Sequence, residues 1–236
     1  GLCLVGSEMC IRDRLLSLLS VSVFSQTSNI FEPIDVFDLE YVSNTQISSD
    51  GDKVLYQRNF NDIMTDSSFS NIWLIDYDGT NNRPITTGNF KDNSPKWSNN
   101  GDKFIFKSNR EGKSQIFLFN LRNNSLQKLT NFQYSIESTQ WSPNDKYILF
   151  SSFIDSDRDT LIEMPEKPKG AKWNDPPIEI SDLNYRYDSS GFRKPGEVQF
   201  FTIPINGGTP RQISNIKPEK RAGQAEWLGN DKIIFS

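Results

Sequence analysis

Two short groups of side chains in this sequence have types and spacing that could do chemistry. In the first, Asp155, Asp157 and Asp159 alternate, and Glu166 follows at the twelfth position counted from Asp155, which is the ligand spacing of a calcium-binding EF-hand loop. That loop needs a glycine at its sixth position for a sharp turn, and Thr160 stands there. We therefore interpret the segment as a solvated acidic turn and predict no metal site.

The second group is the run Tyr185, Arg186 and Tyr187. A guanidinium can bind a carboxylate through two parallel hydrogen bonds, and the neighbouring tyrosines offer aromatic surfaces beside it. The alternative is a surface ion pair between Arg186 and either Asp182 or Asp188. The sequence leaves both readings open.

Histidine is absent from all 236 residues, and its absence excludes several chemistries. A Ser-His-Asp or Cys-His nucleophile needs an imidazole that carries a proton near neutral pH. Zinc sites built on histidine are excluded as well, and Cys3 and Cys10 are too few for a cysteine-only zinc site. Catalysis by this chain would have to use carboxylates, Lys, Tyr or a bound ion, and we predict no cofactor.

The composition favours many short strands over a helical bundle. Apolar residues make up 35% of the chain and aromatic residues 12%, among many Ser, Asn and Asp that suit polar turns. The net charge is −4 and no block of Lys and Arg stands out, so we do not expect a nucleic-acid partner.

The N-terminal residues must be separated from the fold. Residues 1–14 show no helix or strand period and resemble a translated library-adapter sequence. Residues 15–26, LLSLLSVSVFSQ, have the length and character of a signal-peptide core and are too short to span a bilayer as a helix. We predict a truncated signal peptide, no membrane span, and a periplasmic or secreted protein; the alternative is a disordered or buried N-terminal strand.

Internal repetition marks the rest of the chain. Each repeat has a lead aromatic residue or Ile, a short turn of Ser, Asn, Asp or Gly, and a three-residue apolar run. Asp-Gly, Asn-Gly and Asn-Asp supply residues that tolerate positive φ, so each repeat predicts two strands joined by a tight turn. The repeats are residues 47–56, 97–106, 141–150 and 227–235.

A second pair of strand signals follows three of these hairpins, at residues 71–87, 115–130 and 198–214. Each unit therefore predicts four antiparallel strands, and the units start at a spacing close to the roughly 40–50 residues of a propeller blade. We predict an all-β fold over residues 31–236: a partial β-propeller of TolB-type, WD40-like blades. It would hold about three blades and the first hairpin of the next.

Residues 153–196 interrupt this pattern and form either an insertion or a degenerate blade. We favour an insertion because residues 165–177 are rich in proline, which cannot donate a hydrogen bond to a sheet. The equivalent lead positions Ile47, Trp97, Trp141 and Trp227 are predicted to pack between sheets, since a lone blade cannot bury them. An exposed ring of sugar-stacking aromatics is the alternative.

Several segments carry a resemblance to a known family. They are the opening FEPIDVFDLEYVSNTQISSDGDKVLYQRNFNDIMTDSSFSNIWLIDYDGTNNRPIT, the hairpin WSPNDKYILFS, the loop MPEKPKGAKWNDPP with the following LNYRYDSSGF, and INGGTPRQIS. Together they resemble the N-terminal propeller of the prolyl oligopeptidase family, most closely its acylaminoacyl-peptidase and dipeptidyl-peptidase-like bacterial members. The blade hairpin alone is also typical of TolB propellers.

The resemblance implies a serine peptidase whose propeller gates access of short peptides to an α/β-hydrolase domain. This chain holds no G-x-S-x-G elbow and no histidine, so the catalytic domain would be encoded beyond Ser236 and the chain alone would be inactive. Peptide substrate would then contact Tyr185, Arg186 and Tyr187.

Two other functions remain open. One is a non-catalytic TolB-like propeller that serves as a periplasmic protein-interaction platform. The other is a propeller glycosidase, which would need two facing carboxylates, and the sequence offers no pair that we would choose.

Overall fold

The computed structural model describes residues 30–156, 165–174, 177, 180, 185–188, 191–216 and 223–235. The chain divides into two compact units, residues 1–36 and 37–236. A short 3-10 helix, η1 (Pro33–Asp38), begins near the end of the first unit. The predicted adapter-like segment 1–14 and signal segment 15–26 lie outside the described residues.

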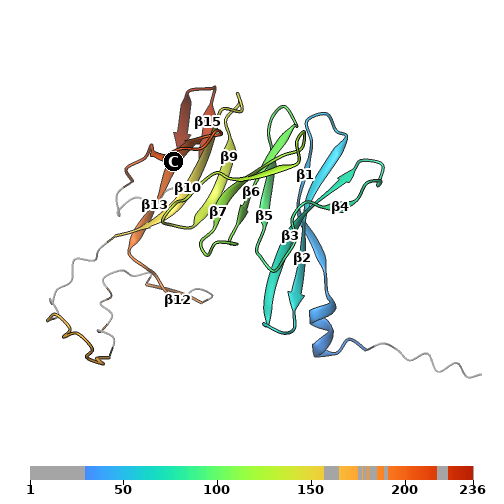
Figure 1. The fold of residues 1–236 in the computed structure, drawn as a ribbon. Helices are drawn as coiled ribbons and strands as arrows, with labels where there is room; N and C mark the ends of the chain where they lie inside the picture. Colours follow the sequence, from blue (N-terminus) through green and yellow to red (C-terminus); the bar gives the residue numbers. More distant parts are fainter. Residues whose placement is uncertain are drawn as a thin grey trace, which may run out of the picture. The chain divides into compact units, whose positions relative to one another are not determined.

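The second unit consists of antiparallel sheets, labelled in Figure 1, which confirms the predicted all-β fold. Blade 1 contains β1 (Tyr41–Ile47), β2 (Lys53–Asp62), β3 (Ser67–Asp76) and β4 (Arg83–Pro84). Blade 2 contains β5 (Asn93–Trp97), β6 (Lys103–Ser108), β7 (Gln115–Asn120) and β8 (Ser125–Lys128). Blade 3 contains β9 (Ile136–Trp141), β10 (Tyr147–Asp155), β13 (Gly196–Pro204) and β14 (Arg211–Gln212). Two hairpins complete the unit: β11 (Arg186–Tyr187) with β12 (Gly191–Phe192), and β15 (Ala225–Leu228) with β16 (Lys232–Phe235).

The connection between β10 and β13 contains the segment predicted as an insertion. These two strands pair directly over their whole length, from Tyr147 opposite Pro204 to Asp155 opposite Gly196. In the sequence, residues 156–195 therefore separate two strands that are direct neighbours in one sheet. This topology supports an insertion over a degenerate blade, and the sheet extends into both ends of the predicted segment 153–196.

A serine-led turn closes the first hairpin of each blade. The serine N–H donates to a main-chain oxygen five residues later at 2.8–2.9 Å, and a residue with positive φ follows inside the turn. The serines are Ser48, Ser98 and Ser142, and the residues with positive φ are Gly51, Gly101 and Asp145. The predicted Asp-Gly, Asn-Gly and Asn-Asp turns are thus confirmed.

The hydroxyl residue that ends each fourth-strand segment also has a repeated role. It accepts a hydrogen bond of 2.8–2.9 Å from a main-chain N–H in the third strand of the same blade. The pairs are Thr86 with Ile72, Thr130 with Ile116, and Ser214 with Phe200. The hydroxyl replaces a main-chain acceptor where the short outer strand ends, and so satisfies a buried N–H.

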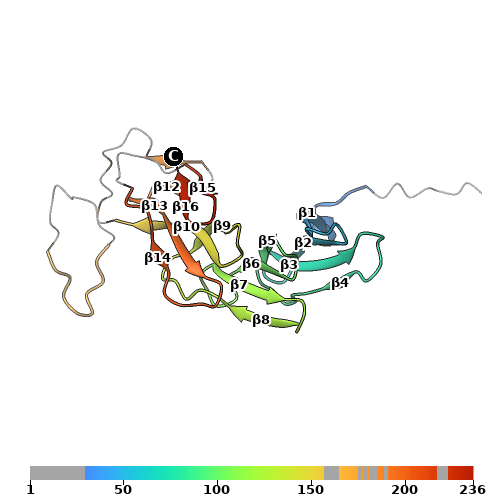
Figure 2. The ribbon, with the colours of Figure 1, turned by 90° about the horizontal axis from the view of Figure 1, so that it is seen from above.

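Blade 2 is buried on both faces because alternate side chains along its central strands join different cores. Phe104, Phe106, Phe117 and Phe119 pack with Leu55, Ile72 and Leu74 of blade 1. Ile105, Ile116 and Leu118 pack with residues of blade 3, including Trp141 and Phe150. Figure 2 shows blade 2 between the other two blades. Burial on both faces explains the uninterrupted apolar runs in β6 and β7.

The lead tryptophans connect consecutive blades. Trp141 is buried in the core shared by blades 2 and 3, and its Nε1 donates to the main-chain oxygen of Lys96 at 2.9 Å. Trp97 is half-buried against the core shared by blades 1 and 2, and its Nε1 donates to the main-chain oxygen of Gln46 at 3.0 Å. Trp227 is half-buried at the equivalent position of β15.

The prediction that Ile47 belongs to the core is wrong. Its side chain is 70% exposed. Ile47 pairs with Val54, whereas Leu55, on the opposite face of the sheet, packs toward blade 2. Ile47 therefore lies on the face of blade 1 turned away from blade 2, and a lead position is buried only where a preceding sheet covers it.

Candidate functional site

The hairpin β11–β12 brings the predicted site residues together. Arg186 pairs with Phe192 across the hairpin, and the Tyr185 ring stacks on the Phe192 ring with centroids 6.3 Å apart. The Arg186 guanidinium lies 6.0 Å from the centroid of the same ring. Tyr185, Tyr187 and Phe192 are each about half exposed. Phe192 was missed from the sequence, although its aromatic type so close to Tyr187 could have indicated it.

The arrangement presents one cation among aromatic surfaces. Among the described residues, Arg186 forms no ion pair with Asp188, and Asp182 lies outside them. A guanidinium held against a ring keeps its outer N–H groups free to bind a carboxylate. The hairpin can therefore hold an anionic end group and an adjacent apolar or aromatic side chain.

A cleft of about 490 Å³ lies between blade 3 and the β15–β16 hairpin, and we call it the interblade cleft. Its apolar part comes from the central strands of blade 3. Its polar part comes from β5, β9, β10 and the start of β15. The apolar lining residues are Leu149, Val198 and Phe200, and the polar ones include Lys96, Glu137, Ser138, Gln140, Ser151 and Glu226.

Two lysines of blade 2 lie close to the polar part of the interblade cleft. Burial lowers the pKa of Lys96, which lines the cleft. Burial also lowers the pKa of Lys107, whose Nζ donates to the main-chain oxygen of Glu137 at 2.5 Å. The cleft combines a desolvated cation with the carboxylates of Glu137 and Glu226.

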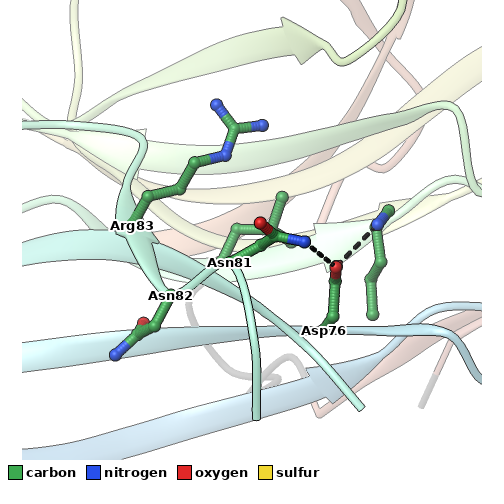
Figure 3. A pocket seen from close by; sticks show the side chains of 6 residues that line it. Asp76, Asn81, Asn82 and Arg83 are labelled. Carbon is green, nitrogen blue, oxygen red and sulfur yellow. Dashed lines mark hydrogen bonds and ion pairs between the residues drawn. The ribbon is translucent and has the colours of Figure 1, made fainter. Parts of the chain in front are cut away.

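A second pocket, of about 470 Å³, lies at the turn between β3 and β4 (Figure 3). Asp76 accepts hydrogen bonds from Asn81 Nδ2 at 2.6 Å and from Lys53 Nζ at 2.7 Å. These bonds, that of Asn81 foremost, lower the pKa of Asp76. The carboxylate is ionised and held by its own turn, so it shapes the turn and is unsuited to donate a proton.

The acidic segment falls partly outside the described residues: Asp155 and Glu166 are described, while Asp157, Asp159 and Thr160 are not. Within the described ranges, no three His, Cys, Asp or Glu side chains lie close enough together to hold a metal ion. The described part of the chain also contains no helix that is both long and apolar enough to cross a bilayer.

Residues 60–167 match the family described as the TolB beta propeller domain. This match and the repeated four-stranded antiparallel sheets define the fold class: the chain has the blades of a β-propeller, and part of it is similar to TolB propeller domains. It is 25% identical over 186 residues to the "Uncharacterized peptidase YuxL" of Bacillus subtilis, which covers 78% of this chain and 28% of that protein.

Other relatives belong to two kinds of protein. Dipeptidyl-peptidase 5 of Porphyromonas gingivalis is 25% identical over 70% of this chain and 24% of its own length. A TolB homolog of Chlamydia abortus is 28% identical over 60% of this chain and 33% of its own. The chain thus spans about a third or less of each of these relatives.

Among solved structures, the fold is similar to the Pyrococcus horikoshii acylaminoacyl peptidase. The TM-score is 0.62 at 19% identity, over 84% of this chain and 28% of that enzyme. The predicted resemblance to propellers of peptidases of the acylaminoacyl- and dipeptidyl-peptidase type is confirmed.

Proposed function

We propose that this chain is the propeller part of a secreted or periplasmic serine peptidase that cleaves short peptides. The observation that carries the proposal is the similarity to a peptidase over 186 residues, which are 78% of this chain. Because the chain has no histidine, the base that activates the serine must come from another domain.

In this proposal the hydrolase domain performs the chemistry. Its serine attacks the peptide carbonyl, its histidine takes the serine proton, and its oxyanion hole stabilises the tetrahedral intermediate. The propeller covers the active-site cavity and admits only short or unfolded peptides. The β11–β12 hairpin holds the substrate, with Arg186 on a peptide carboxylate and Tyr185 and Tyr187 beside a neighbouring side chain.

The gene beyond the codon for Ser236 tests the proposal. The expected result is a G-x-S-x-G elbow followed by an Asp and a His, and a full-length product that reacts covalently with a fluorophosphonate probe. Further tryptophan-led hairpins up to a stop codon, with no probe reaction, would contradict it.

The role of Arg186 is tested in that full-length product. Arg186→Gln should raise KM for peptides with a free carboxylate about 10- to 150-fold with kcat unchanged, since one charge-assisted contact contributes about 1.5–3 kcal/mol. Peptides with an amidated C-terminus should show no change. Arg122→Gln is the matched control, because Arg122 is an exposed arginine paired with Asp102 on blade 2. Equal effects on both peptide types would assign Arg186 a structural role.

A second candidate, the non-catalytic interaction platform, is favoured by the TolB family match and the TolB homologs. It predicts that the full-length protein binds a protein partner and lacks a hydrolase domain. The gene sequence beyond Ser236 therefore decides between the two.

A further inference from the structure

Each of the first two interfaces between blades contains the same hydrogen bond. Trp97 Nε1 donates to the main-chain oxygen of Gln46, and Trp141 Nε1 donates to the main-chain oxygen of Lys96. In both cases the acceptor stands one residue before the lead position of the preceding blade. The bond therefore follows from the repeat.

The third interface lacks this bond. Trp227 pairs with Ile233 just as Trp141 pairs with Ile148, so the register makes it the third lead tryptophan. By the pattern of the other two interfaces, Trp227 Nε1 would donate to the main-chain oxygen of Gln140, the residue before the lead position Trp141. Within the described part of the chain, Trp227 Nε1 is instead shielded from solvent without a hydrogen-bond partner, and so is Gln140 Oε1.

The interblade cleft lies at the same interface. Its walls are β9 and the start of β15, with Gln140 on one side and Glu226, the neighbour of Trp227, on the other. The rings of Phe200 and Phe235 are 5.6 Å apart, so β16 contacts blade 3 while the cleft separates the first strands. The small residues Gly223 and Ala225 leave that side of the cleft open.

We propose that the β15–β16 hairpin moves relative to blade 3 between two positions, one open and one closed. The open position is the one described above. In the closed position Trp227 Nε1 donates to the main-chain oxygen of Gln140, and the hairpin fills the interblade cleft. This inference goes beyond the proposed function and holds for a peptidase propeller and for an interaction platform alike.

Opposing physical terms balance the two positions. Closure gives a shielded indole N–H an acceptor and removes the apolar surface of Leu149 and Phe200 from the cleft. It also brings Glu226 toward Glu137, and like charges repel more strongly where water is excluded. Two packed arrangements of similar energy are the requirement for a switch between discrete positions.

Nuclear magnetic resonance of the indole N–H groups in the intact chain tests the proposal. The chain has five tryptophans, and single Trp→Phe variants assign their signals. Trp97 and Trp141 report a bonded indole, Trp73 a buried indole without a partner, and Trp173 an exposed one. We expect two signals for Trp227, one of them with slow solvent exchange and a shift like those of Trp97 and Trp141. A single Trp227 signal, whether open or closed, would overturn the proposal.

Two filling variants test the link between the bond and the cleft. Ala225→Phe fills the cleft from the hairpin, and Val198→Phe fills it from blade 3. Each should abolish the bonded Trp227 signal while the Trp97 and Trp141 signals stay in place, which also shows that the blades remain folded. Lys232→Gln, on the exposed part of the same hairpin, is the control and should leave both signals unchanged. A hydrogen-bonded Trp227 signal that persists in both filling variants would contradict the proposed closure of the hairpin.

Discussion

Blades 2 and 3 fill the same position with opposite chemistry. Five residues before the lead tryptophan, blade 2 has Asp92 and blade 3 has Ile136. Four residues after Phe106, blade 2 has Arg110, and four residues after the equivalent Phe150, blade 3 has Ile154. Asp92 Oδ2 accepts from Arg110 Nη2 at 2.8 Å, whereas Ile136 and Ile154 pack in one apolar core.

The ion pair in blade 2 lies in an apolar environment. The Asp92 side chain is fully buried, and the Arg110 guanidinium lies 5.0 Å from the centroid of the Phe117 ring. Asp92 Oδ1 has no hydrogen-bond partner among the described residues. The comparison indicates that the repeat tolerates a salt bridge or an apolar pair at this position, but that the two residues must change together.

Arg110→Met should have the largest effect of the changes considered. It leaves the Asp92 carboxylate buried without a counterion, which costs about 3–5 kcal/mol in the free energy of unfolding. Urea unfolding measures the loss. Arg122→Met, which breaks an exposed pair with Asp102, is the control and should cost at most about 1 kcal/mol.

The double variant Asp92→Ile with Arg110→Ile transplants the pair of blade 3 into blade 2. Because replacement of a buried ion pair by apolar residues of similar size is often neutral or stabilising, we expect a free energy of unfolding within about 1 kcal/mol of the parent. Two single losses that simply add in the double variant would show that the residues do not act as a pair.

Substitution of two glycines, Gly112 in the connection between β6 and β7 and Gly196 at the start of β13, should give the next largest difference in stability. Gly196 has φ of 142°, and a Cβ there would lie 2.3 Å from the main-chain oxygen of Ile154; Gly112 has φ of 97° and open space around it. Gly112→Ala should cost about 1–2 kcal/mol for backbone strain alone. Gly196→Ala should cost about 1–3 kcal/mol more because of the overlap. Urea unfolding of both variants measures the difference, and equal losses would contradict it.

Removal of the hydroxyl group that ends a fourth-strand segment should lower the free energy of unfolding by a smaller amount. Thr130 Oγ1 accepts from the N–H of Ile116 and donates to Gln115 Oε1. Thr130→Val therefore leaves the N–H of Ile116 buried without an acceptor, while Gln115 Oε1 keeps the bond from the N–H of Phe132. The expected loss is about 1–3 kcal/mol, measured by thermal or urea unfolding. Ser125→Ala, at the exposed start of β8, is the control.

The two half-buried lysines of blade 2, Lys96 and Lys107, should give the smallest effect, a change of stability with pH. Their pKa values are lowered in the folded chain, so the unfolded chain holds more protons between the folded pKa and the ordinary value of 10.5. Stability should therefore rise with pH through that window. Lys96→Gln with Lys107→Ser, the residues at the equivalent positions of blade 3, should remove the rise that urea unfolding measures as the pH approaches 10.5. An unchanged slope would mean that burial of the lysines does not cause it.

Much of the fold could be predicted because turn chemistry is local. Ser98, Gly101 and Trp97 stand within five residues of one another, and such a group repeats visibly along the chain. The exposure of Ile47 could not be predicted in the same way, since burial at a lead position depends on whether a preceding sheet covers that face.

The sites were harder to predict because they join distant residues. Asp92 and Arg110 are far apart in sequence, and alignment of the repeats conceals the pair because blade 3 has isoleucines in both places. The interblade cleft joins β9 to β15, so its lining appears only once the third interface is built. Tyr185, Arg186 and Tyr187 could be proposed from the sequence because they are consecutive.

Native-state hydrogen exchange of the backbone amides tests the central claim most directly: that consecutive sheets bury each other's faces. Blade 2 is covered on both faces, whereas the face of blade 1 that carries Ile47 is turned away from blade 2. The account predicts that amides of β6 and β7 exchange more slowly than those of β2 and β3, by a factor of ten or more, since deeply packed strands open only with global unfolding. Equal protection of the two blades, or slower exchange in β2 and β3, would contradict it.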